Sequence, residues 1–304
     1  MDQYLDTLND GTSLVLEQYD ALRAIWGDIL QGFSCSTWRG EEVYVKHLGD
    51  VEHCKISQIQ TDLTLKYLNM GVPTRQERLD FIMKESEEWN QDDEDEITSA
   101  EYFISDNQET YDKMSLPHQK EMLGEELTKQ RNIIYEKKAE KDRKIGTVAE
   151  TKAEKTANNY YVYYSLFKDE GLTKPFWDKK AFEELEDYEL TSYVILYNQA
   201  LTPFRSKNFN KIAIMPFTLN LASYCKDNGE FFYGKPITQM TNYQLSVFTK
   251  VMKNTFILRE TKTSGSPDIN NELTMETLLG WYEVEYNIIM AENQANRAAA
   301  NSRR

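Results

Sequence analysis

The fold class is decided by residues 117–167, which read PHQKEMLGEELTKQRNIIYEKKAEKDRKIGTVAETKAEKTANNYYVYYSLF. Opposite charges recur four residues apart, as in Glu140 and Lys144, a spacing that stabilises an exposed helix. Gly146 is suited to end this helix, and the capping-box pattern Thr147-Val148-Ala149-Glu150 is suited to begin another. The stretch therefore predicts a long antiparallel helical hairpin, polar at its tip and aromatic near its base.

The residues before this stretch also have a helical period. Apolar residues between Ile56 and Met70 are three or four apart, which predicts an amphipathic helix that stops at Gly71. A second capping box, Thr74-Arg75-Gln76-Glu77, predicts the start of the next helix and hence a short helical hairpin. Residues 85–110 then contain many acids and neither Lys nor Arg.

The two ends of the chain differ from each other. Glycines interrupt the first fifty residues, and the alternation over residues 41–48 predicts a strand. The C-terminal part has the apolar spacing of several helices, including one over 208–226 with a kink at Pro216. One side of the last helix carries Met275, Leu278, Leu279, Tyr282, Tyr286, Ile289 and Met290.

Together these patterns predict a mainly α protein with helical clusters, the long hairpin and a small N-terminal β-hairpin or ribbon. We expect four segments. They are an irregular lobe with short strands at 1–49, a helical hairpin with the acidic segment at 50–115, the long polar hairpin at 116–170, and a C-terminal helical cluster at 178–304.

The charge balance excludes some classes of partner. The 304 residues carry 50 acidic and 35 basic side chains, a net charge of −15, so we expect neither broad contact with nucleic-acid phosphates nor binding to a membrane. No stretch has the roughly 18 apolar residues of a membrane-spanning helix, and MDQYLDTLNDG lacks the features of a signal peptide. Three cysteines give no disulfide framework and favour a reducing compartment.

We find no pattern typical of a metal, cofactor or catalytic site. Cys35, His47, His53 and Cys54 lie within twenty residues, but their spacing lacks the close ligand pairs of zinc sites. An EF-hand loop that began in the acidic segment would have Ile97 where glycine is required. Nucleotide-binding glycine motifs and nucleophile motifs are absent as well. We therefore predict no metal, no cofactor and no enzymatic activity.

Two groups of residues are candidates for a partner interface. The first is the run Tyr160, Tyr161, Tyr163 and Tyr164, which points to several sides of one helix. Either these tyrosines are half-buried around the base of the hairpin, or some of them contact a partner, since tyrosine is enriched at interfaces.

The second group is acidic and consists of Asp92, Asp93 and Asp95. These acids either form a solvated helix N-terminus, with Asn90 as its cap, or attract a basic partner. One such partner is the basic stretch of a neighbouring subunit, Lys137, Lys138, Lys141, Arg143 and Lys144.

The order of these features resembles that of uncharacterised structural and tail-assembly proteins of large tailed bacteriophages. The strand Val43-Tyr44-Val45 precedes the acid-rich Trp89-Asn90-Gln91-Asp92-Asp93-Glu94, and the box Thr147-Val148-Ala149-Glu150 precedes Asp169-Glu170-Gly171. The resemblance covers roughly residues 40–175 and concerns organisation. It implies a non-enzymatic component of the virion tail, baseplate or neck, or of its assembly. Its partners are other virion or assembly proteins or further copies of itself, in the host cytoplasm and then in the virion.

Two other classes of function remain open. An acidic inhibitor could imitate DNA phosphates and occupy a host enzyme, but mimicry needs carboxylates along one continuous face. A helical enzyme with carboxylate chemistry would need a paired motif such as Glu-x-x-His, which the sequence lacks.

Overall fold

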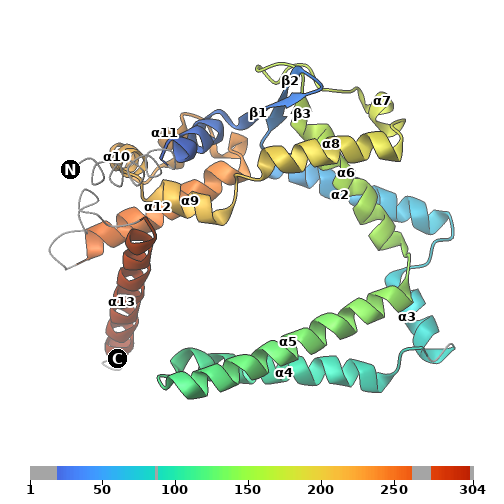
Figure 1. Ribbon diagram of the computed structural model, residues 1–304, viewed down its shortest axis with the longest axis horizontal. Coiled ribbons are helices and arrows are strands. Elements are labelled where there is room, and N and C mark those ends of the chain that lie inside the picture. The colour runs from blue at the N-terminus through green and yellow to red at the C-terminus, as the bar shows by residue number, and fades with distance from the viewer. Residues whose placement is uncertain (1–18, 86–87, 262–274, 302–304) are drawn as a thin grey trace, which may run out of the picture. The chain divides into compact units, whose positions relative to one another are not determined.

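The chain is described by a computed structural model over residues 19–85, 88–261 and 275–301 (Figure 1). Most of these residues are helical, and the sheet found among them has three short strands in the order β1-β2-β3. The predicted fold class, mainly α with a small N-terminal β-hairpin, is thereby confirmed.

The chain divides into two compact units. The hairpin unit is Ser57–Asn158, and the sheet unit combines the residues up to Ile56 with those from Asn159 onward. This division differs from the four predicted segments. The reason is that the helix over residues 19–31 and the β-hairpin share hydrophobic cores with helices that come late in the sequence.

The hairpin unit contains the end of α2 (Asp50–Asn69), α3 (Arg75–Lys84), α4 (Gln91–Lys113), α5 (Pro117–Ile145) and the start of α6 (Ala149–Ser165). Figure 1 shows α4 and α5 side by side and antiparallel. The long hairpin is thus formed by α4 with α5, and the pairing predicted within 117–167 is wrong, because α5 packs along α4 and α3. The hydrophobic core of the hairpin unit consists of Ile82, Trp89, Ile97, Ile145 and Val148.

The sequence offered three helix caps in this unit, at Thr74, Asn90 and Thr147, and the first two are present in the structure. The side chains of Thr74 and Asn90 each close a capping box, at the starts of α3 and α4. The third box, at Thr147, does not form, because α6 begins at Ala149. The carboxylate of Glu150 instead accepts hydrogen bonds from the backbone N–H of Arg75 at 3.0 and 3.1 Å.

The sheet of the sheet unit is built on a tight hairpin. Strand β1 (Phe33–Trp38) pairs antiparallel with β2 (Glu41–Lys46), and the two residues between them, Arg39 and Gly40, both have positive φ. Such a turn matches the twist of the strands that it joins. The two-residue strand β3 (Leu166–Phe167) pairs with the other edge of β2, where the sequence had predicted continued helix.

The sheet unit also contains the remaining helices. These are α7 (Lys179–Glu183), α8 (Asp187–Leu201), α9 (Ser206–Ala213), α10 (Pro216–Cys225), α11 (Gly229–Tyr233), the 3-10 helix η1 (Ile237–Gln239), α12 (Asn242–Glu260) and α13 (Met275–Asn301). The predicted kink at Pro216 is instead a break, because α9 ends before the proline and α10 begins on it. Proline has no N–H to donate and is favoured in the first turn of a helix.

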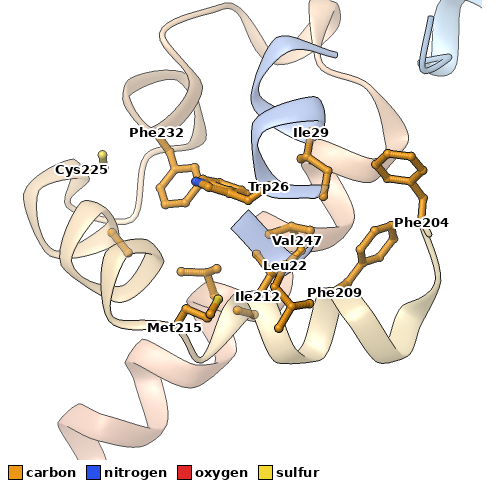
Figure 2. Close-up of a cluster of buried hydrophobic side chains, with 13 residues drawn as sticks. Leu22, Trp26, Ile29, Phe204, Phe209, Ile212, Met215, Cys225, Phe232 and Val247 are labelled. Atoms are coloured by element: carbon orange, nitrogen blue, oxygen red, sulfur yellow. The ribbon is translucent and has the colours of Figure 1, made fainter. Parts of the chain in front are cut away.

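The largest core of the sheet unit surrounds the 19–31 helix (Figure 2). Leu22, Trp26 and Ile29 of this helix pack against side chains from α9 to α12, among them Ile212 and Val247. The buried amide of Gln244 in α12 donates hydrogen bonds to the carbonyl oxygens of Ile29 at 2.7 Å and Leu30 at 3.1 Å. Carbonyl groups near the end of a helix lack partners within the helix, so this contact fixes the end of the 19–31 helix on α12.

Candidate interaction surfaces

The four tyrosines of α6 belong largely to the sheet unit's interior. Tyr160 is 7% exposed, donates a hydrogen bond to Glu183 at 2.9 Å and packs edge-on against Phe182. Tyr163 lies 5.0 Å from the Phe182 ring and 5.1 Å from that of Tyr164, between ring centroids. Burial and the Glu183 carboxylate raise the pKa of the Tyr160 phenol. The Tyr160 side chain therefore has an intramolecular role.

The other three tyrosines are half-buried. The hydroxyl of Tyr161 is 3.2 Å from Nδ1 of His53, and the ammonium group of Lys55 lies over the ring of Tyr164. Burial raises the pKa of Tyr164. These contacts hold the tyrosines in place but leave part of each accessible, so an interface role for Tyr161, Tyr163 and Tyr164 stays a prediction.

The acidic stretch has basic partners within its own chain. Lys137 of α5 contacts Asp93 at 2.7 Å and Glu96 at 2.8 Å. Further pairs join Lys138 to Glu101 and Lys141 to Glu94. These three lysines belong to the basic stretch that one of the two alternatives assigned to a neighbouring subunit. The acidic and basic side chains do form ion pairs, but these pairs join α4 to α5 of the same chain.

Among the three predicted interface acids, only Asp93 takes part in this pairing. Its carboxylate closes the capping box at Asn90, and the hydrogen bond from Lys137 lowers its pKa. Asp92 and Asp95 are exposed, and Asp95 accepts a hydrogen bond from the amide of Gln91. Asp92 and Asp95 therefore remain available to a partner, whereas Asp93 has a structural role.

The C-terminal helix α13 carries a second apolar face that we had not identified. Its docked face, which includes Leu278, Tyr282 and Ile289, packs against Ile214 and Ile257. A separate, exposed stripe with alternating spacings of four and three residues runs along the middle of the helix: Val284, Ile288, Ala291 and Ala295. Trp281, which precedes this stripe, is partly buried and packs against the core of the docked face. Val284 lies about 200° round the helix from Tyr282. Val284 and Ile288 are 57% and 48% exposed. The signal was present in the sequence as the spacing typical of a coiled-coil seam.

The histidines and cysteines of the N-terminal part are not brought together. Cys35 and Cys54 are exposed, whereas His47 is 1% exposed and accepts or donates a hydrogen bond with Ser34 at 2.8 Å. Across the described residues, no group of three or more His, Cys, Asp or Glu side chains is placed to hold a metal ion.

Burial, with a smaller contribution from Lys235, lowers the pKa of His47 to about 3. The imidazole is therefore neutral at pH 7. It packs edge-on against the rings of Phe204 and Tyr243, with centroid distances of 4.4 and 5.1 Å. We assign His47 to the core.

Comparisons with known proteins add no relatives. No protein family, no curated protein and no solved structure matches this chain. Among the helices of the described residues, none is both long and apolar enough to cross a bilayer.

Proposed function

We propose that this protein is a non-enzymatic component of a multi-copy assembly, a virion structural or tail-assembly protein of a tailed bacteriophage. It acts through contacts with other proteins and with further copies of itself. The observation that carries the proposal is the outer stripe of α13, defined as Val284, Ile288, Ala291 and Ala295. The link to bacteriophage rests on the resemblance in the order of sequence features.

The occupant of the outer stripe is α13 of a second copy. The alternating spacing keeps one seam facing a partner helix over about three turns, and the two alanines allow a close approach of the backbones. Both helices of such a pair would use the same face, as in the two-fold dimers that are the commonest assemblies.

The charges beside the stripe favour a parallel pair. In parallel register, Asn287 of one copy lies beside Glu292 of the other, an amide next to a carboxylate. In an antiparallel pair Glu285, whose carboxylate accepts a hydrogen bond from Thr261 at 2.6 Å, would lie on the same side of the seam as Glu292 of the other copy, and like charges across a seam are unfavourable.

The expected affinity is modest. About half of the Val284 and Ile288 side chains is still exposed, and burying the rest is worth roughly 1 kcal/mol for each. Four such side chains in a dimer supply about 4 kcal/mol. This gain is comparable with the free-energy cost of lost translational and rotational freedom, so the pairing of two copies is weak. Weak pairwise contacts suit an assembly in which several contacts act together.

The rival function, an acidic inhibitor that imitates DNA, is less compatible with the observed contacts. Mimicry requires a continuous row of exposed carboxylates. In the hairpin unit, Asp93, Glu94 and Glu101 face lysines of α5 instead. Their charges are locally neutralised, which interrupts the acidic face.

Sedimentation analysis of the full chain tests the proposal. The double variant Val284→Ser/Ile288→Ser should weaken self-association roughly 1,000-fold, on the basis of the 4 kcal/mol above. The matched control is Ile195→Ser in α8, which removes a side chain of similar exposure (51%) outside the stripe and should leave self-association unchanged. A wild-type protein that stays monomeric at the highest attainable concentration would remove the observation that carries the proposal.

A further inference from the structure

A small pocket lies where three helices of the sheet unit meet. Its volume is about 250 Å³, and its walls come from α9, α12 and α13. Five of the residues that line it carry hydrogen-bond donors: Asn210, Lys250, Lys253, Asn254 and Tyr282. Leu279 and Glu283 complete the lining. The pocket is on the docked side of α13, so it is separate from the outer stripe.

The two lysines of this pocket have no carboxylate partner among the described residues. Lys250 is half-buried, and burial together with the nearby charge of Lys253 lowers its pKa. Lys253 lies over the ring of Tyr286, at 3.8 Å from the centroid, a contact that positions the ammonium group without neutralising it. Within a chain of net charge −15, two neighbouring ammonium groups that form no ion pair are unusual.

The neutral groups of the pocket supply further donors. The Nδ2 atom of Asn254 is engaged with the carbonyl oxygen of Ala213 at 3.1 Å, which fixes the orientation of this amide. Tyr282 is almost fully buried, and burial raises its pKa to about 12, so its hydroxyl stays protonated at neutral pH. Glu283 is the one acidic side chain of the lining. The set therefore combines two cations, one anion and uncharged donors.

We propose that this pocket binds a small oxyanion with two negative charges, inorganic phosphate or a phosphomonoester. Two ammonium groups match a ligand of charge near −2, and neutral donors can satisfy its remaining oxygens. The volume is below that of pockets for drug-sized ligands and fits a group of this size. Bound phosphate would also relieve the repulsion between Lys250 and Lys253. The inference goes beyond the assembly function and does not depend on it.

The test is phosphate binding by the full-length protein, measured by titration calorimetry at constant ionic strength with chloride as the reference anion. We expect saturable binding of one phosphate, with phenyl phosphate binding comparably. Lys250→Gln/Lys253→Gln should reduce the affinity at least tenfold. The control Lys179→Gln/Lys180→Gln removes the same charge from exposed positions in α7 and should bind as the wild type does.

A second variant distinguishes a loss of phosphate binding from a loss of folding in Lys250→Gln/Lys253→Gln. Asn210→Asp keeps both lysines but adds a carboxylate to the lining, and it should abolish phosphate binding while the circular dichroism spectrum is unchanged. Three results would overturn the proposal: no saturable phosphate binding, equal weakening in both lysine pairs, or malonate binding as tightly as phosphate. The last result would assign the pocket to carboxylates.

Discussion

Acid should destabilise this protein through one buried side chain, His47. The imidazole is 1% exposed, its Nε2 atom is bonded to Ser34, and its Nδ1 atom has no hydrogen-bond partner among the described residues. Its pKa is about 3 in the folded state, compared with 6.5 for an unperturbed imidazole, mainly because of burial and secondarily because of Lys235. Protonation thus favours the unfolded chain.

The magnitude follows from linkage between protonation and folding. Above pH 6.5 the imidazole is neutral in both states, and its contribution to stability is fully present. As the pH falls below 6.5 the unfolded state takes up a proton that the folded state excludes until about pH 3. Each pH unit below 6.5 lowers the free energy of unfolding by about 1.4 kcal/mol. At pH 4.5 the loss is about 2.7 kcal/mol, a large part of a typical stability of roughly 5–15 kcal/mol.

Urea denaturation at pH 6.5, 5.5 and 4.5, followed by circular dichroism, measures this loss. His47→Gln keeps a group that can bond to Ser34 but does not titrate. The variant should be less stable than the wild type at pH 6.5, and this difference in the free energy of unfolding should shrink by about 2.3 kcal/mol on going to pH 4.5, because about 0.4 kcal/mol is already lost at pH 6.5. Both proteins contain the same carboxylates, so the titration of these groups drops out of the difference between the two free energies of unfolding. His118→Gln, which removes an exposed imidazole, should follow the wild-type profile. A deficit that is constant over this pH range would refute the reasoning.

Five further substitutions test local contacts by urea denaturation. Gln244→Ala should lower the free energy of unfolding by about 2–3 kcal/mol, since the buried carbonyl group of Ile29 and the part-buried one of Leu30 lose their donor, and a loss under 1 kcal/mol would contradict the anchoring role. Gly49→Ala should destabilise by about 2 kcal/mol because its Cβ would lie 2.6 Å from the carbonyl oxygen of Met240. Gly27→Ala, which meets nothing within 4 Å in a helix, should be neutral or stabilising. Asp93→Asn should cost about 1 kcal/mol through the cap and the lysine contact, whereas Asp95→Asn at an exposed position should stay within 0.5 kcal/mol; equal effects would contradict the distinction between them.

Local signals in the sequence predicted the elements well. The capping box at Thr74 and the cap at Asn90 depend on neighbouring residues, and the alternation over 41–48 depends on the period of a strand, so each can be recognised within a few residues. Pro216 marked an interruption correctly, although its position at the start of a helix made it a boundary and not a kink.

Pairing between elements was harder to predict because it depends on residues far apart in the chain. The acids of α4 and the lysines of α5 were both recognised, but their sequence positions do not say whether they meet within one chain or between two. The burial of Tyr160 depends on Phe182 and Glu183, and that of His47 on Phe204 and Tyr243. The outer stripe of α13 was legible, but the stronger apolar spacing of the docked face masked it.

The central claim, that α13 pairs in parallel with α13 of a second copy, is tested most directly by disulfide cross-linking. In a background of Cys35→Ser and Cys54→Ser, which removes the exposed thiols, a cysteine is introduced at Ile288 of the outer stripe or, as a control, at Glu283, which is exposed but lies on the docked side of the helix. In a parallel pair the two residues at position 288 face each other across the seam, so mild oxidation should give a covalent dimer with Ile288→Cys and little with Glu283→Cys. Equal cross-linking of both variants, or a protein that remains monomeric with Ile288→Cys, would contradict the account.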